Sequence, residues 1–134
     1  MKNIDHIGIA VKDIEKSNLL FEKLLNTPCY KIEEVKDQGV KTSFFKTEDQ
    51  KIELIASLGE QSPIESFLEK KGEGLHHIAF EVANIKSEVE RLKSEGFVPI
   101  DKTPKKGADN KMVVFLHPKA TNGVLIELCQ EIKW

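Results

Sequence analysis

Two stretches of the sequence, DHIGIAVKDI at residues 5–14 and HHIAFEVANI at residues 76–85, decide the fold because the second repeats the first. His6 aligns with His77 at an offset of 71 positions. The same offset, without a gap, aligns Ile7 with Ile78, Val11 with Val82, Asp13 with Asn84, and Ile14 with Ile85. The chain is therefore predicted to contain two copies of one module.

Each copy is predicted to begin with a strand followed by a helix. Asp13 and Asn84 follow the first strand of each copy, where a short side-chain oxygen can accept hydrogen bonds from the first turn of a helix. Positions at helical spacing come next: Ile14, Ser17, Phe21 and Leu24 in the first copy, and Ile85, Val89 and Leu92 in the second. Gly96 is expected to end the second helix, because a positive φ is common there.

Three more strands are expected in each copy, at residues 29–35, 40–45 and 51–56 and at residues 97–100, 112–116 and 123–129. Residues 58–73 connect the copies, with Pro63 beginning a short helix over residues 64–70. The sequence thus predicts the α+β class, with two tandem βαβββ modules, about residues 1–57 and 74–134, in a single domain of residues 1–134. A core of half this length is marginal alone, so the modules are expected to share a cleft.

The composition is that of an ordinary globular protein. Of 134 residues, 40% are hydrophobic and 31% charged, with 20 basic and 22 acidic side chains. This balance argues against nucleic acid or a membrane as a partner, because a basic excess is typical of both. No apolar run reaches about 18 residues, the length of a membrane span. Cys29 and Cys129 are far apart and no export signal is recognisable, so we expect free thiols and a cytoplasmic protein.

Alternation along the strands favours His77 over its neighbour His76 as a functional residue. Successive strand residues face opposite sides, so His77 shares one face with Ala79 while the apolar residues occupy the other. The apolar face is expected to pack under the helix, which leaves His77 on the open side. His6 has the same place in the first copy, whereas His76 and His117 are expected to be structural or to lie near a substrate.

Each copy also carries a glutamate in its last strand, Glu53 in KIELIAS and Glu127 in GVLIELC. An acid between aliphatic residues is costly unless it is exposed or paired with a cation. Glu53 follows His6 by 47 positions and Glu127 follows His77 by 50, so two pseudo-symmetric modules would bring all four residues to one point. Two imidazoles and two carboxylates suit a divalent ion such as Co, Ni, Zn, Mn or Fe.

Each of these four residues also has an ordinary interpretation when it is taken alone. A single strand histidine is usually packed or at the surface, and a single strand glutamate usually lies on a solvated face. The repeat favours the metal site, because chance would have to place the same residue types at matching positions twice. The predicted metal ligands are therefore His6, Glu53, His77 and Glu127.

Longer motifs carry a resemblance to a known family. They are DHIGIAV at residues 5–11, QGVK at 38–41, IELIASLGEQSPI at 52–64, FLEKKGEGLHHIAFEV at 67–82 and FLHPKATNGVLIEL at 115–128. Over essentially its whole length the chain resembles the vicinal oxygen chelate, or glyoxalase-like, superfamily and, within it, the methylmalonyl-CoA epimerases. The first motif is typical of the superfamily as a whole, and the last three together are much more specific.

The resemblance implies an isomerase that interconverts (2R)- and (2S)-methylmalonyl-CoA at C2, through an enediolate chelated by a divalent ion. It places the metal ligands of the family at His6, His77 and Glu127, with Glu53 at the fourth position and cobalt as the expected ion. It also implies a coenzyme A thioester as substrate, a homodimer and a place in propionate metabolism.

Epimerisation requires an acid or base on each side of C2. Glu127 is the expected catalytic group on one side, because a ligand's second oxygen can face the carbon. Some members of the family carry a glutamate where this chain has Thr42, and an alcohol is a poor general base. Glu53, or a water or side chain that the sequence does not identify, is then expected on the other side.

Two other functions fit the same fold. A glyoxalase I would share its length and ligand types, but such chains usually end in a DP-G-x-x-I/V-E motif, and this chain reads HPKATNGVLIE. A non-catalytic protein that binds a small molecule is the second alternative. Such binders commonly lose metal ligands, whereas this chain keeps all four.

Residues 102–119 carry five lysines, at positions 102, 105, 106, 111 and 119, against one acid, Asp109. One interpretation is a solvated hairpin that its charges keep soluble. The other is that some of these lysines contact the phosphates of coenzyme A. Lys119 is the favoured residue for binding coenzyme A, because HPK matches the motif of the family and leads into the strand of Glu127.

Overall fold

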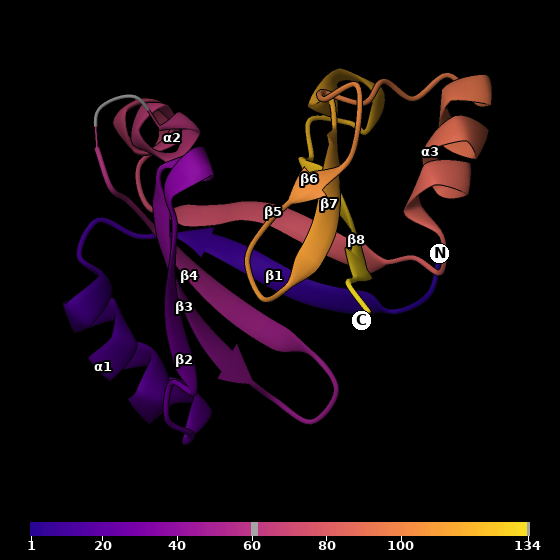
Figure 1. Ribbon diagram of the computed structural model, residues 1–134. Coiled ribbons are helices and arrows are strands. Elements are labelled where there is room, and N and C mark those ends of the chain that lie inside the picture. Colours follow the sequence, from indigo (N-terminus) through magenta and orange to yellow (C-terminus); the bar gives the residue numbers. More distant parts are fainter. Residues whose placement is uncertain (60–61, 134) are drawn as a thin grey trace. The chain divides into compact units, whose positions relative to one another are not determined.

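The computed structural model describes residues 1–59 and 62–133, and its contacts divide the chain into two compact units (Figure 1). The first unit comprises residues 6–76, and the second comprises residues 1–5 together with the chain from residue 77 onward. The connector expected at residues 58–73 lies in the first unit, although residues 60 and 61 within it are outside the described residues. The single domain expected from the sequence stays a prediction.

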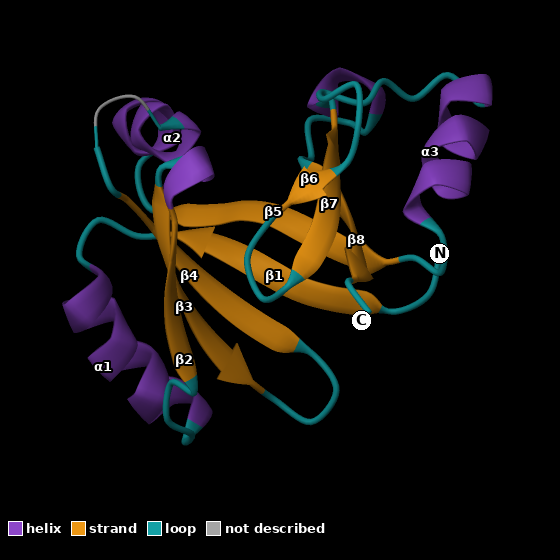
Figure 2. Ribbon diagram, in the orientation of Figure 1, coloured by secondary structure: helices purple, strands orange, loops and turns teal. Residues whose placement is uncertain are grey.

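The first unit contains a four-stranded sheet and two α-helices (Figure 2). Its elements are β1 (Ile4–Ala10), α1 (Ile14–Leu25), β2 (Lys31–Val35), the 3-10 turn η1 (Lys36–Gln38), β3 (Val40–Lys46), β4 (Lys51–Ser57) and α2 (Pro63–Lys71). From His6 onward β1 pairs in parallel with β4, and β4 with β3 and β3 with β2 are antiparallel pairs. The strand order is therefore β2-β3-β4-β1.

The second unit repeats this topology. Its elements are β5 (Gly74–Glu81), α3 (Ile85–Ser94), β6 (Lys105–Lys106), β7 (Lys111–Leu116), the 3-10 turn η2 (Pro118–Ala120) and β8 (Ile126–Glu131). β5 pairs in parallel with β8, and β8 with β7 and β7 with β6 are antiparallel pairs. The equivalent orders in the two units confirm the α+β class and the repeated βαβββ topology.

The first residues of the chain belong to the second unit by hydrogen bonding as well as by contact. The backbone N–H of Lys2 donates to the carbonyl oxygen of Glu81 at 2.8 Å, and the N–H of Glu81 donates to the carbonyl of Asn3 at 2.9 Å. Asp5 is ion-paired with Lys111 of β7. The amino-terminal pentapeptide is therefore an integral part of the second unit.

The helices begin where the sequence predicts. The carboxylate of Asp13 accepts from the N–H of Lys16 at 3.1 Å, and the amide oxygen of Asn84 accepts from the N–H of Ser87 at 3.0 Å. Gly96 follows the end of α3 with φ of 99°. Among the described residues, no helix combines the length and the apolar character that crossing a membrane requires.

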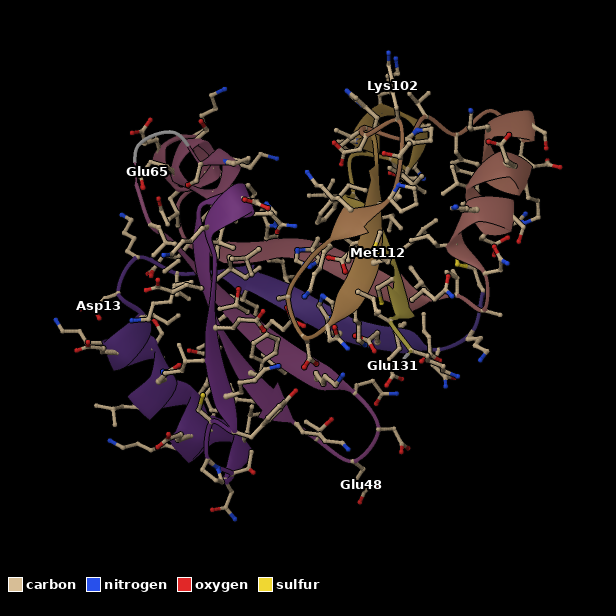
Figure 3. The ribbon with its side chains drawn as sticks, viewed as in Figure 1. Asp13, Glu48, Glu65, Lys102, Met112 and Glu131 are labelled. Carbon is tan, nitrogen blue, oxygen red and sulfur yellow. The ribbon has the colours of Figure 1, made fainter. Side chains whose placement is uncertain are left out.

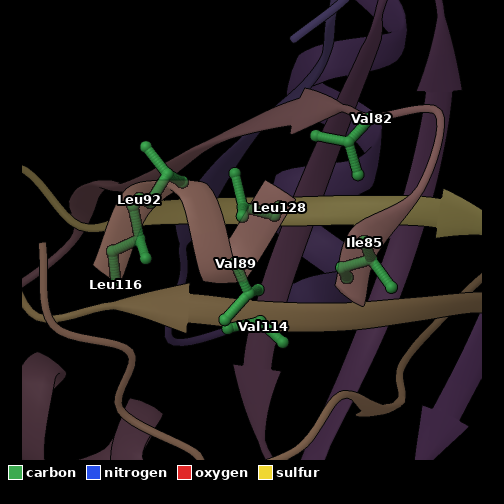
Figure 4. Close-up of a cluster of buried hydrophobic side chains, with 7 residues drawn as sticks. All are labelled: Val82, Ile85, Val89, Leu92, Val114, Leu116 and Leu128. Atoms are coloured by element: carbon green, nitrogen blue, oxygen red, sulfur yellow. The ribbon is translucent and has the colours of Figure 1, made fainter. Parts of the chain in front are cut away.

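The apolar core of the second unit lies between α3 and the sheet (Figure 4). Its buried members are Val82, Ile85, Val89, Leu92, Val114, Leu116 and Leu128. Burial of each such side chain contributes about 1.5–3 kcal/mol. In the first unit, the prediction that Leu24 is the last core-facing residue of α1 is wrong. Leu24 is 71% exposed, and Leu25 packs on the core instead. At 3.6 residues per turn, position 25 follows Phe21 on the buried face better than position 24.

Two predicted strands of the second unit differ from the observed ones. Residues 97–100 form only an isolated bridge, from Pro99 to Leu116, and the paired edge strand is β6. The N–H of His117 donates to the carbonyl of Val98 at 2.6 Å and the N–H of Ile100 donates to the carbonyl of Phe115 at 2.8 Å, so Pro99 lies where a backbone N–H would face away from β7. The last strand begins at Ile126, because Gly123 has φ of 82° in a turn and not an extended backbone.

Candidate functional site

His6 and Glu53 form a buried pair in the first unit. In the parallel register His6 lies beside Lys51 and Gly8 lies beside Glu53, so both side chains leave the same face of the sheet. His6 Nδ1 is 3.1 Å from Glu53 Oε2, and the residues are 3% and 6% exposed. The glutamate is thus buried and paired, as its place between aliphatic residues requires.

His77 and Glu127 form the equivalent pair in the second unit. Ala79 of β5 lies beside Glu127 of β8 in the parallel register, which puts His77 and Glu127 on one face. His77 Nε2 is 3.2 Å from Glu127 Oε1, and the residues are 5% and 6% exposed. Each unit therefore contains one buried imidazole facing one buried carboxylate.

An aromatic residue that was not among the predicted site residues accompanies each pair. Phe44 lies directly opposite Glu53 across β3 and β4, and Phe115 lies directly opposite Glu127 across β7 and β8. Phe115 meets the ring of His77 edge-on, with 5.5 Å between centroids. Phe44 and Phe115 are 71 positions apart, the same offset as the two histidines, so extending the repeat along the strands could have found them.

The geometry of each pair fits two ligands of one metal ion. Two ligand atoms about 2.1 Å from one ion, at angles between 90° and tetrahedral, are about 3.0–3.4 Å apart. The nitrogen–oxygen distances of 3.1 and 3.2 Å lie in that range. Each pair thus offers one imidazole nitrogen and one carboxylate oxygen at the spacing of two ligands of one ion, and these donors suit borderline divalent ions.

The remaining histidines make structural contacts. His76 meets Phe67 of α2 edge-on with 4.9 Å between ring centroids. His117 is exposed, and its Nδ1 accepts a hydrogen bond from the N–H of Lys119 at 3.2 Å, which caps η2. Both contacts agree with the structural interpretation of these two residues.

The lysines of residues 102–119 divide into exposed and buried ones. Lys102 extends away from the ribbon (Figure 3), and Lys106 and Lys119 are exposed as well. Lys105 lies 3.4 Å from Asp101. Lys111 differs from the others, because it is 8% exposed and its Nζ donates to the carboxylate of Asp5 at 2.6 Å. Lys111 is therefore a structural cation, which the run of charges in the sequence concealed.

Comparison with known proteins identifies the family. Residues 5–115 match the Glyoxalase/Bleomycin resistance protein/Dioxygenase superfamily, so the chain belongs to this superfamily. Two relatives are similar over most of its length. "Methylmalonyl-CoA epimerase, mitochondrial" of Dictyostelium discoideum is 42% identical, covering 93% of this chain and 76% of the relative. "Ethylmalonyl-CoA/methylmalonyl-CoA epimerase" of Cereibacter sphaeroides is 41% identical, covering 95% and 96%.

A solved structure supports the same relationship. A variant of Streptomyces coelicolor methylmalonyl-CoA epimerase, in complex with 2-nitronate-propionyl-CoA, superimposes with a TM-score of 0.94 at 30% identity. The alignment covers 98% of this chain and 95% of that one. The named relatives and this structure are epimerases, and they support assignment of the present chain to the isomerases.

Proposed function

We propose that the protein is a metal-dependent epimerase that interconverts the (2R) and (2S) forms of methylmalonyl-CoA. The observation that carries the proposal is the presence of one buried histidine–glutamate pair in each unit, His6 with Glu53 and His77 with Glu127. The similarity to epimerases over almost the whole chain supports the choice of substrate.

The four paired residues would together hold one divalent ion, with cobalt as the proposed metal. When bound, such an ion supplies a positive charge that stabilises the negative charge developing on the thioester and carboxylate oxygens of the substrate. Burial of both pairs excludes water from the donor atoms and fixes the side chains before substrate binds. Phe115 holds the ring of His77 in one orientation through its edge-on contact.

Carboxylates of this chain would transfer the proton at C2. Glu127 has two carboxylate oxygens, of which Oε1 faces His77 Nε2 at the distance given above. The other oxygen can accept the C2 proton on one side of the substrate and return it in the reverse direction. Glu53 is the equivalent carboxylate of the first unit, and in this proposal it binds the ion.

Isotope exchange tests the proposal directly. Metal-reconstituted protein is incubated with methylmalonyl-CoA in deuterated water, and mass spectrometry follows deuterium at C2 against a blank without protein. We expect rapid exchange together with interconversion of the two epimers. Turnover of the glutathione adduct of methylglyoxal, without exchange at C2 of methylmalonyl-CoA, would identify a glyoxalase I-like lyase instead. Binding of a small molecule with neither reaction would identify a binding protein.

We further propose that the active species is a cytoplasmic homodimer that acts in propionate metabolism. Sedimentation of the metal-loaded protein at micromolar concentration tests the assembly, and a sedimentation coefficient of one chain of 15.2 kDa would contradict it.

A further inference from the structure

The proposed function requires a second proton-transfer group besides Glu127. A proton that leaves C2 on one side and returns on the other needs an acid or base on each side. Glu53 is, like Glu127, already assigned to the ion in this proposal, so a carboxylate outside the ligand set is the better choice for the second side of C2. We infer that Glu33, on β2 of the first unit, is this second catalytic group, an inference that rests on the proposed epimerase activity.

The strand register puts Glu33 on the same face as His6 and Glu53. Glu53 of β4 lies opposite Phe44 of β3, so Thr42, two residues before Phe44, faces the same side. Thr42 in turn lies directly opposite Glu33 of β2. Side chains of residues directly opposite each other in an antiparallel pair leave the sheet on one side. Glu33 therefore extends over the face that carries the histidine–glutamate pair.

Among the residues of β1 to β4, all of which the structure describes, Glu33 and Glu53 are the two carboxylates on this face. The other residues on this face are the following: Ile4, His6, Gly8 and Ala10 of β1, Lys31 and Val35 of β2, Val40, Thr42, Phe44 and Lys46 of β3, and Lys51, Ile55 and Ser57 of β4. Thr42 is 2% exposed, and its hydroxyl cannot act as a base near neutral pH.

The separation of Glu33 from Glu53 leaves room for a substrate between them. They lie two strands apart and are offset by two residues, which corresponds to about 12 Å between Cα atoms at standard sheet spacings. The side chain between them in the row of Glu33 is that of Thr42, which is small. A substrate bound to an ion at Glu53 can therefore lie in the interval between Glu53 and Glu33, within reach of the Glu33 carboxylate.

The surroundings of Glu33 suit repeated proton transfer. Its side chain is 32% exposed, so it can exchange a proton with water between turnovers. Lys31 Nζ lies 3.4 Å from Glu33 Oε1 and 4.9 Å from the centroid of the Phe44 ring. The carboxylate of Glu33 thus has a cationic neighbour on its own strand and remains partly open to water.

The proton balance closes through solvent. In one direction the C2 proton moves to the Glu33 carboxylate, and protonated Glu127 delivers a proton to the opposite side of the carbon. Glu33 then carries one proton more than before and Glu127 one fewer. Water restores both states, and the reverse reaction uses the two groups in the opposite order.

The test follows exchange and configuration separately for each epimer. Metal-loaded wild type and Glu33→Gln are incubated with (2R)- or (2S)-methylmalonyl-CoA in deuterated water. Mass spectrometry reports deuterium at C2, and a coupled enzyme specific for one epimer reports configuration. For Glu33→Gln we expect interconversion to fall by roughly 10²–10⁴-fold, the usual contribution of an acid–base group. One epimer should still exchange its C2 proton with retention of configuration, because Glu127 remains, and the other should not.

Glu34→Gln is the matched control, because Glu34 lies on the same strand, faces the opposite side and is exposed. It should behave as the wild type, and Glu33→Asp should recover part of the lost rate. Wild-type interconversion by Glu33→Gln would overturn the role of Glu33 alone. Equal loss of exchange from both epimers would also overturn it, since that result indicates a role in binding or folding. A wild type without exchange would overturn the proposed function and this inference together.

Discussion

Lys111 and Asp5, 106 positions apart in the sequence, form an ion pair of 2.6 Å in which each side chain is only 10% exposed. Asp5 immediately precedes His6, one of the proposed metal ligands, while Lys111 begins β7. Asp5, the residue before a proposed metal ligand, is thus held within the second unit by a buried ion pair.

Replacing one partner of this pair should be costly. We expect Lys111→Met to lower the free energy of unfolding by about 3 kcal/mol, because it leaves the charge of Asp5 buried without its partner. The double change Asp5→Asn/Lys111→Met should be less destabilising than the sum of the single changes. Urea denaturation measures all of these values, with the exposed Lys106→Met as the control. Additive effects of the two single changes would show that the pair does not couple.

Glu127→Gln and His77→Ala should have different effects on metal binding and turnover. A neutral amide can still offer an oxygen to an ion but cannot take up a proton at useful pH. We expect Glu127→Gln to lose more turnover than metal, and His77→Ala to lose both. Metal content is measured from the visible absorption of the cobalt-loaded proteins and turnover from C2 exchange. Glu131→Gln, at the exposed end of β8, is the control, and wild-type exchange by Glu127→Gln would show that Glu127 is not a base.

Lys119 and its exposed neighbours are predicted to contact the phosphates of coenzyme A. Each exposed ammonium group should contribute about 0.5–1 kcal/mol. Lys119→Ala and the double change Lys105→Ala/Lys106→Ala should therefore raise KM several-fold at low salt and less at high salt, with kcat nearly unchanged. The effect should vanish with a thioester that lacks the nucleotide. Equal KM changes for the full and the truncated substrate would contradict the contact.

Glu88 of α3 should make stability depend on pH. Its hydrogen bond from Arg91 Nε, at 2.6 Å, and a second one from the amino terminus lower the pKa of the Glu88 carboxyl to about 2. Because the folded-state pKa lies below the unfolded value, the stabilisation is present above about pH 4.3 and is lost as the pH falls toward 2. Arg91 is half exposed, so we expect no more than about 1 kcal/mol.

Urea denaturation of wild type and Glu88→Gln at pH 6, 4 and 2.5 measures this effect. The difference in unfolding free energy should be largest at pH 6 and smallest at pH 2.5. Glu90→Gln is the control, because the pair of Glu90 with Lys93 is long, at 3.6 Å, and exposed. A difference that is independent of pH would show that the charge of Glu88 is not the cause.

The repeat made much of the fold predictable from the sequence. The caps at Asp13 and Asn84, the choice of His77 over His76 and the glutamates of β4 and β8 all follow from local patterns and a single offset. Alternation decides which side chains share a face within a strand, so the members of each histidine–glutamate pair could be named in advance.

Features that depend on pairing between distant strands were not predictable. The register that puts Glu33 opposite Thr42 is set by the turn between β2 and β3. A shift of this register by one residue would move every side chain of β2 to the other face of the sheet. The buried role of Lys111 depends on Asp5 at the other end of the chain. The edge strand β6, two exposed lysines long, has no hydrophobic pattern by which a strand could be recognised.

The two hydrogen bonds between residues 2–3 and Glu81 have a consequence for biosynthesis. Ribosomes add about 5–20 residues per second, so Glu81 is made roughly 4–16 s after Asn3. The first unit is one continuous stretch of chain, so all of its strands and helices have been made once residue 76 has been added. The amino-terminal pentapeptide, in contrast, has its partners in the part of the chain from residue 77 onward and remains unpaired on the nascent chain until these have been synthesised. Slowing translation between residues 77 and 131 would therefore lengthen the time for which this segment is open to proteases and to wrong partners.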